Sequence, residues 1–139
     1  MIALVFLLGC QPEPWEPPSG WENEEVAAPE VLLDGLDDPR GVVLVDGAIV
    51  VAEFGGGRVL WLDGEITAVE GFDGPYMVAT DGTSAVVTER GAGRVLLIAS
   101  DGSYEVLADG LVNPGRVVVA DGTAWWVEQG AGALWRAEL

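Results

Sequence analysis

The chain has 139 residues, a length that suits one domain, and half of them are hydrophobic. Its 23 acidic residues against six arginines give a net charge of −17, which disfavours binding to nucleic acid or to anionic lipid. The absence of histidine removes the usual base of a nucleophilic triad and the commonest zinc ligand, and the single cysteine excludes an internal disulfide. The composition therefore indicates a packed acidic domain without a conventional triad.

The first ten residues, MIALVFLLGC, are apolar throughout. This run is shorter than the roughly 20 residues of a membrane-spanning helix, but it has the length of a signal-peptide core. Leu7-Leu8-Gly9-Cys10 resembles the lipobox of bacterial lipoproteins, although no Lys or Arg precedes it. The resemblance implies cleavage before Cys10 and lipid attachment to that residue, with residues 1–9 as the signal peptide. The alternative is an inert cysteine in an apolar strand.

Residues 10–29 are expected to be the lipidated cysteine and a spacer rich in Pro and Glu. The segment from 11 to 30 holds five of the eight prolines and has no apolar periodicity, which is typical of an extended, solvated stalk. Gln11, in place of Asp, resembles the outer-membrane default of Gram-negative lipoproteins. We therefore expect a lipoprotein of the bacterial cell envelope, anchored in the outer membrane by its lipid and facing the periplasm or the surface.

Residues 30–139 contain one phrase three times: VAEFGGGRVLWL (51–62), VTERGAGRVLLI (87–98) and WVEQGAGALWRA (126–137). The glutamates Glu53, Glu89 and Glu128 are 36 and 39 residues apart, and one proline per copy keeps the same two spacings. A phosphate-binding loop normally occurs once per domain, so three copies of Gly-x-Gly indicate a structural repeat.

Each copy divides into short apolar runs separated by turn signals such as Asp-Gly and Gly-x-Gly, a pattern typical of antiparallel strands joined by hairpins. Four such strands per 36 to 39 residues predict the blades of a β-propeller, and a parallel β-helix is the alternative. We therefore predict an all-β domain of about three four-stranded blades. VLLDGL (31–36) matches a fourth strand, so the predicted order is D-ABCD-ABCD-ABC.

The run GLDDPRGV, followed by Asp-Gly, VVAE and GRV, resembles an NHL-type repeat and the blades of gluconolactonase-like six-bladed propellers. The resemblance covers residues 30–139 and implies the architecture more than any activity. Three blades leave two open edges, and a homodimer would complete a six-bladed ring. Completion by another propeller chain, a truncated remnant of a longer propeller, and a stable open stack are the alternatives.

Strand alternation places the loops with Pro and the loops with Glu-x-Gly-x-Gly on the same face of the predicted propeller. Oxygen ligands there could hold Ca²⁺ or another divalent ion, and no other cofactor is indicated. Alternatively, each glutamate accepts amide hydrogens of a turn or pairs with an arginine five residues later, a pairing that would fail where Ala133 stands. The residues expected on this face are Asp37, Asp38, Arg40, Glu53, Asp73, Tyr76, Glu89, Asn113, Arg116 and Glu128, with Arg90 and Gln129 nearby and with Asp37, Asp73 and Asn113 as the metal candidates.

Three functions remain open. The first, which we favour, is a non-catalytic binding module that contacts a protein or a glycan through this loop face. The second, implied by the lactonase resemblance, is a metal-dependent hydrolase. Asp37 or Asp38 and Asn113 are loose matches to that family's metal ligands, and its Asn-Gly step after the Pro loop is missing here. The third is a propeller remnant without independent activity.

Overall fold

The computed structural model describes residue 19 and residues 28–139. The predicted signal peptide, Cys10 and almost all of the spacer lie outside the described residues. Residues Leu33–Leu139 form one compact unit. Its strands are β1 (Pro39–Val45), β2 (Ala48–Glu53), β3 (Arg58–Asp63), β4 (Glu65–Glu70), β5 (Pro75–Thr80), β6 (Ala85–Glu89), β7 (Arg94–Ile98), β8 (Tyr104–Ala108), β9 (Pro114–Ala120), β10 (Thr123–Glu128) and β11 (Ala133–Glu138).

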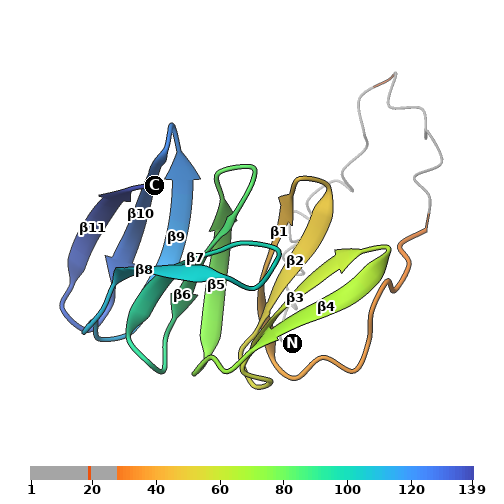
Figure 1. Ribbon diagram of the computed structural model, residues 1–139, viewed down its shortest axis with the longest axis horizontal. Helices are drawn as coiled ribbons and strands as arrows, with labels where there is room; N and C mark the ends of the chain where they lie inside the picture. The colour runs from red at the N-terminus through yellow and green to blue at the C-terminus, as the bar shows by residue number, and fades with distance from the viewer. Residues whose placement is uncertain (1–18, 20–27) are drawn as a thin grey trace, which may run out of the picture. The chain divides into compact units, whose positions relative to one another are not determined.

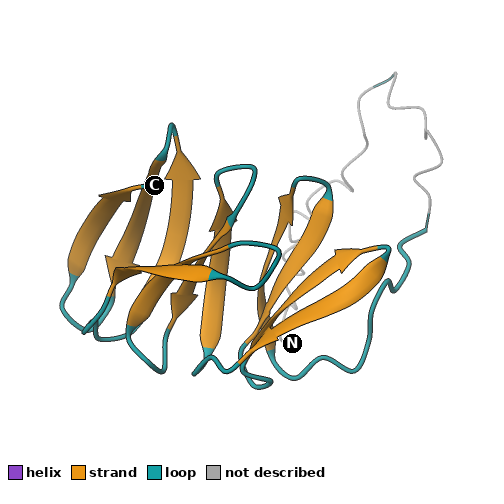
Figure 2. Ribbon diagram, viewed as in Figure 1, coloured by secondary structure: helices purple, strands orange, loops and turns teal. Residues whose placement is uncertain are grey.

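These strands form three sheets in which consecutive strands are antiparallel neighbours (Figures 1 and 2). Sheet 1 contains β1–β4, sheet 2 contains β5–β8, and sheet 3 contains β9–β11. The first strands β1, β5 and β9 lie side by side, so sheet 2 stands between sheets 1 and 3 (Figure 1). The prediction of an all-β chain with strands in the order ABCD-ABCD-ABC is confirmed.

The strand predicted at residues 31–36 is absent from the structure. A strand exists only where its backbone groups pair with a neighbour, and this segment pairs with no described strand. The apolar pattern of VLLDGL resembles that of a fourth strand, but the described strands of the chain provide no partner for it, so the strand predicted there does not form.

Two Asp-Gly pairs, at 46–47 and 121–122, form two-residue hairpin turns, and Asp81-Gly82 begins the longer turn between β5 and β6. Asp46 and Gly47 have φ values of 47° and 84°, and Asp121 and Gly122 have values of 48° and 69°. Positive φ at both central residues is characteristic of the tight turn that matches the twist of antiparallel strands. Asp and Gly suit these positions because both adopt the left-handed region more readily than other residues.

Two apolar clusters join the sheets. The first lies between sheets 1 and 2 and includes Val50, Trp61, Val87 and Ile98. The second lies between sheets 2 and 3 and is centred on Val86, Val95, Val117 and Trp126. Because side chains alternate along a strand, sheet 2 contributes one face to each cluster. Sheets 1 and 3 each use one face in the same way, and their other faces meet no sheet.

Candidate functional site

The three repeated glutamates end the second strand of each sheet and are buried. Glu53, Glu89 and Glu128 are 0%, 1% and 5% exposed. Each carboxylate accepts a hydrogen bond from the backbone amide 16 residues earlier, at distances of 2.5, 2.6 and 2.7 Å. The donors are the amides of Asp37, Asp73 and Val112, in the loops that lead into the first strand of each sheet. Each glutamate therefore joins a loop to the hairpin of its own repeat.

Each carboxylate also accepts a hydrogen bond from a side chain. The guanidinium of Arg58 bonds Glu53, and that of Arg94 bonds Glu89 with its closest nitrogen at 2.6 Å. In sheet 3, where Ala133 replaces the arginine, the indole Nε1 of Trp135 donates to Glu128 at 2.8 Å. The sequence predicted that Glu128 would lack the partner that an arginine provides in the other repeats. It did not show that Trp135, two positions beyond Ala133 on β11, could supply the donor instead.

Electrostatics at Glu53 follow from these contacts. The hydrogen bond from Arg58 lowers the pKa of Glu53 below its ordinary value, burial acts in the opposite direction, and the amide of Asp37 lowers it further. A carboxylate with a lowered pKa stays ionised down to acid pH, which is unsuitable for a general acid. The geometry of this group fits a structural role.

The residue before each proline adopts the left-handed backbone conformation. Asp38, Gly74 and Asn113 have φ values of 52°, 64° and 54°. Asn, Asp and Gly are the residues that tolerate this conformation best, so backbone geometry accounts for Asp38 and Asn113 without a ligand. Within residues 28–139, no three His, Cys, Asp or Glu side chains come together as a metal site would require.

The Gly-x-Gly segments have two separate structural uses. A Cβ added at Gly55 or Gly91 would collide with the carboxylate of Asp37 or Asp73, so the first glycine allows the loop to approach the hairpin closely. The third residue of the segment, Gly57 in sheet 1 and Gly93 in sheet 2, has a φ of 61° or 69° and turns the hairpin. The segments lead from strand to strand rather than into a helix, so they are not phosphate-binding loops.

Arginine and aromatic side chains form a continuous row across the loops. The guanidinium carbon of Arg40 lies 5.5 Å from the ring centroid of Phe54 and 5.8 Å from that of Tyr76. Arg90 covers Tyr76 at 4.8 Å and donates to the side chain of Gln129 at 2.9 Å. We call these five residues the arginine–aromatic row. It links sheet 1 to sheet 3 and is the best candidate for a binding surface.

The structure places some of the other residues predicted for this face beside the row and others away from it. Asp38 forms an ion pair with Arg40 at 2.7 Å and so belongs beside the row. Arg116 is exposed on β9, and no hydrogen bond or ion pair reaches its side chain from the described residues. Phe54 was not among the residues predicted for this face. It occupies the variable position of Glu-x-Gly, the same position as Arg90 and Gln129, and that correspondence was the available signal.

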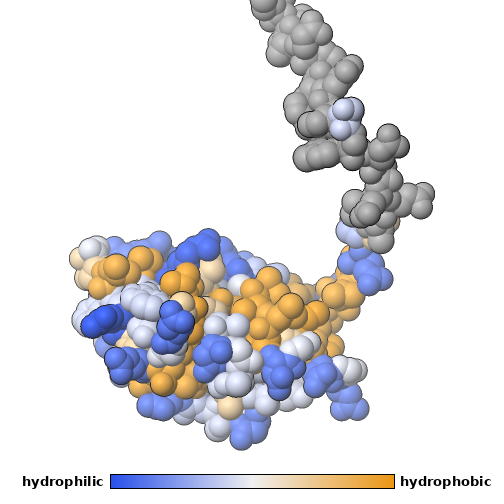
Figure 3. All heavy atoms as spheres, turned by 90° about the horizontal axis from the view of Figure 1, so that it is seen from above, coloured by the Kyte–Doolittle hydropathy of each residue, from blue (hydrophilic) through white to orange (hydrophobic). Residues whose placement is uncertain are grey.

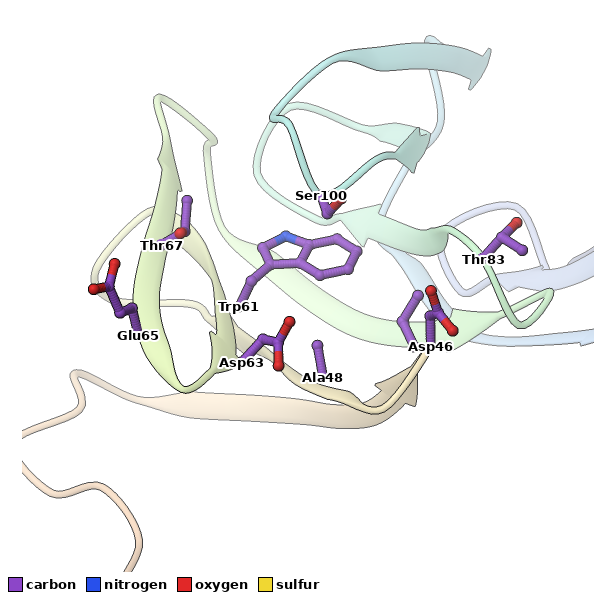
Figure 4. A pocket seen from close by; sticks show the side chains of 9 residues that line it. Asp46, Ala48, Trp61, Asp63, Glu65, Thr67, Thr83 and Ser100 are labelled. Carbon is purple, nitrogen blue, oxygen red and sulfur yellow. The ribbon is translucent and has the colours of Figure 1, made fainter.

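A pocket of about 360 Å³ lies among the opposite turns (Figure 4). Trp61 lines it together with Asp46, Asp63 and Glu65 of sheet 1 and with Thr83 and Ser100 of sheet 2. The sequence does not predict this pocket, because its Asp-Gly pairs are explained by the turns that they form. The carboxylates of the pocket would favour a small cation, whereas the indole N–H of Trp61, which is buried and has no hydrogen-bond partner among the described residues, can only donate a hydrogen bond and cannot bind a cation.

No model of a known protein family matches the chain, and neither does the sequence of any curated protein. Solved structures do match its fold. A chain of the nidogen/laminin complex shares 22% identity with a TM-score of 0.64, over 72% of this chain and 44% of that one. A catalytically inactive virginiamycin B lyase from Staphylococcus aureus, solved with quinupristin, shares 18% identity with a TM-score of 0.57, over 73% and 41%. Hydrazine synthase of Kuenenia stuttgartiensis shares 16% identity with a TM-score of 0.58, over 74% and 36%.

The matched proteins are β-propellers, and the three sheets of this chain match part of such a structure. The chain spans less than half the length of each of the three solved chains. At these identities the match establishes the fold and nothing further. Within the described residues, no helix is long and apolar enough to cross a membrane.

Replacing Trp135 with Phe tests whether the indole substitutes for the missing arginine. The loss of its N–H leaves the buried carboxylate of Glu128 short of a donor, which typically costs about 1–3 kcal/mol. We expect urea unfolding to show this loss. Adding Ala133→Arg to the same protein should restore most of the stability, whereas Ala133→Arg alone should change little. Failure of the double variant to recover would show that packing, rather than the missing donor, caused the loss.

The lowered pKa of Glu53 predicts a specific acid dependence of stability. The ordinary pKa is 4.5, so the contribution of Glu53 is complete above that pH and disappears as pH falls through the lowered value in the folded protein. Glu53→Gln should be less stable at neutral pH and should lose less stability on acidification than the wild type. Denaturant midpoints from pH 7 to pH 3 measure both effects. Parallel curves for the two proteins would contradict the assignment.

Proposed function

We propose that the chain is a non-catalytic binding module of the bacterial cell envelope that contacts a protein or a glycan through the arginine–aromatic row. The observation that carries the proposal is the row itself, in which Arg40 at the start of β1 and Arg90 in the turn after β6 both lie over the half-buried ring of Tyr76 at the start of β5. Stacked guanidinium and aromatic groups are common at the centres of protein interfaces, and they offer flat surfaces to sugar rings.

The charge distribution supports this surface. In a chain of net charge −17, two of the six arginines lie in the row, and among the described residues only Asp38 forms an ion pair with either of them. The row therefore presents cationic groups within an acidic molecule. A ligand with a carboxylate or another acceptor beside an aromatic or sugar ring would satisfy both features.

We favour a binding function for this chain over metal-dependent hydrolysis. Glu53, Glu89 and Glu128 are engaged by amide, arginine and indole donors, and Asp38 is paired with Arg40. The resemblance to gluconolactonase-like repeats is the support for a lactonase, and a lactonase would bind a divalent ion. Lactone turnover that depends on added Ca²⁺, Mn²⁺ or Zn²⁺ would reverse this ranking.

Tyr76→Ala tests the binding proposal because Tyr76 contacts both arginines of the row. We expect capture of the ligand from an envelope extract to fall about tenfold or more, the typical effect of removing a central aromatic contact. Thr83→Ala, in an exposed turn outside the row, is the matched control. Tyr76 takes no part in the glutamate contacts, so we expect Tyr76→Ala to fold. The urea midpoints of both variants check this expectation. Undiminished capture by Tyr76→Ala would exclude the row as the site.

The envelope location rests on the resemblance of Leu7–Cys10 to a lipobox. Labelled palmitate should enter the wild-type protein in cells, and the label should disappear in Cys10→Ala. Fractionation of the same cells should place the wild type in the outer membrane. Equal labelling of the two proteins would remove the lipid anchor from the proposal and leave the binding surface to be tested separately.

A further inference from the structure

Sheet 1 has an apolar face that no other sheet covers. Val43 and Val45 of β1 pack in the cluster between sheets 1 and 2, so the alternate residues Val42 and Leu44 point away from it. Val42 is 69% exposed and Leu44 is 65% exposed. A monomeric protein rarely leaves a continuous apolar face in water, so a face of this kind indicates an interaction surface.

Sheet 3 has the complementary free face at the other end of the row of sheets. Val117 and Trp126 pack against sheet 2. Val118, which follows Val117 on β9, is 52% exposed, and Leu134 of β11, which pairs with Val127, is 73% exposed. Val127 of β10 is exposed beside them. Figure 3 shows apolar surface over both ends of this unit.

The repeat shows what each free face would contact. Leu134 occupies the position of Val59 in sheet 1 and Val95 in sheet 2, and both valines are fully buried against the following sheet. Val42 occupies the position of Val117, which is buried against the preceding sheet. The free face of sheet 3 is therefore equivalent to a face that packs on a following sheet. The free face of sheet 1 is equivalent to a face that packs on a preceding sheet, so the two faces are complementary.

The charges at the two free faces indicate which surface covers each of them. Trp61 lines the pocket between sheets 1 and 2 together with Ser100, which lies in the turn between β7 and β8 (Figure 4). Arg136 stands at the position of Trp61 in sheet 3, and the turn equivalent to that of Ser100 in sheet 1 runs from Asp63 to Glu65. Docking sheet 3 onto sheet 1 of a second copy would thus bring Arg136 to an acidic turn. The side chain of Arg136 forms no hydrogen bond or ion pair with any described residue.

The edge of sheet 3 provides an independent observation. Among the described strands β11 pairs only with β10, whereas its equivalents β3 and β7 each pair with a fourth strand. Residues 31–36, VLLDGL, match residues 106–111, VLADGL, at all positions but one, and residues 106–108 of that match belong to the fourth strand β8. The two segments are 75 residues apart, the same interval that separates Glu53 from Glu128.

From these observations we propose that the partner of both free faces is a second copy of this chain. The two copies associate head to tail, so that sheet 3 of each docks on sheet 1 of the other and residues 31–36 of each pair with β11 of the other. Two copies then form a closed ring of six four-stranded sheets, within the range of four to eight blades known for propellers. Closure covers both free faces of each copy and pairs the free edge of β11 at the same time.

The molar mass of the full-length chain tests association directly. The protein carries Cys10→Ser to prevent lipidation and is kept in a mild non-ionic detergent, so that the apolar first residues do not associate. Light scattering should give twice the chain mass of 14.6 kDa. Val118→Glu with Leu134→Glu should give the monomer mass, whereas Val106→Glu, an equally polar change on the outer strand of sheet 2, should leave the dimer intact.

The acidic turn is tested by charge reversal. Arg136→Glu should raise the dimer dissociation constant about tenfold or more, because it places like charges across the interface. Adding Asp63→Arg and Glu65→Arg to the same chain should recover most of the affinity. Recovery requires that Arg136 of one copy faces the turn of another, an outcome that general destabilisation would not produce.

Cross-linking tests the strand exchange. In the register of sheet 1 Val31 would stand opposite Arg136, and in that of sheet 2 opposite Trp135, because Trp61 pairs with Thr67 and Leu96 pairs with Val106. In the Cys10→Ser background, Val31→Cys with Cys at one of these two positions should form an intermolecular disulfide, and Val31→Cys with Thr83→Cys should not. A monomer in the mass measurement, an open series of oligomers, or equal cross-linking of the control would each overturn the proposal.

Discussion

The structure depends on a buried carboxylate at the end of the second strand of each sheet. A buried charge is unfavourable unless hydrogen-bond donors surround it, and here each carboxylate has two kinds of donor. One is a backbone amide from the loop before the first strand, and the other is a side chain from the third strand. Because these donors come from different parts of the repeat, the glutamate fixes the position of the loop relative to the hairpin.

The position of the candidate binding surface follows from this constraint. The loop that holds Asp37 or Asp73 continues directly into Arg40 or Tyr76, and the glutamate that binds its amide is followed directly by Phe54 or Arg90. Fixing the loop against the hairpin therefore brings the residue after each proline next to the residue after each glutamate. The arginine–aromatic row is built from these two positions in sheets 1 and 2, with Gln129 added from sheet 3.

Much of this arrangement could be predicted from the sequence, because it depends on local patterns. Asp-Gly pairs identified the hairpin turns, and the alternating apolar runs identified the strands and their order. The donor from Trp135 could not be predicted, since it depends on the reach of an indole from two residues beyond the expected position. The stacking of Phe54, Tyr76 and the two arginines also depends on distances between repeats, which spacing along the chain does not give. The segment at 31–36 has the sequence of a strand, but strand formation needs a partner that sequence alone does not locate.

The central claim is that the glutamates are structural caps, and hydrogen exchange at three backbone amides tests it most directly. The amides of Asp37, Asp73 and Val112 should exchange slowly in the folded protein, although they lie in loops outside the sheets. Glu89→Ala should accelerate exchange at Asp73 and leave Asp37 and Val112 protected, because each carboxylate acts within its own repeat. Fast exchange at all three amides in the wild type, or uniform acceleration in the variant, would contradict the account.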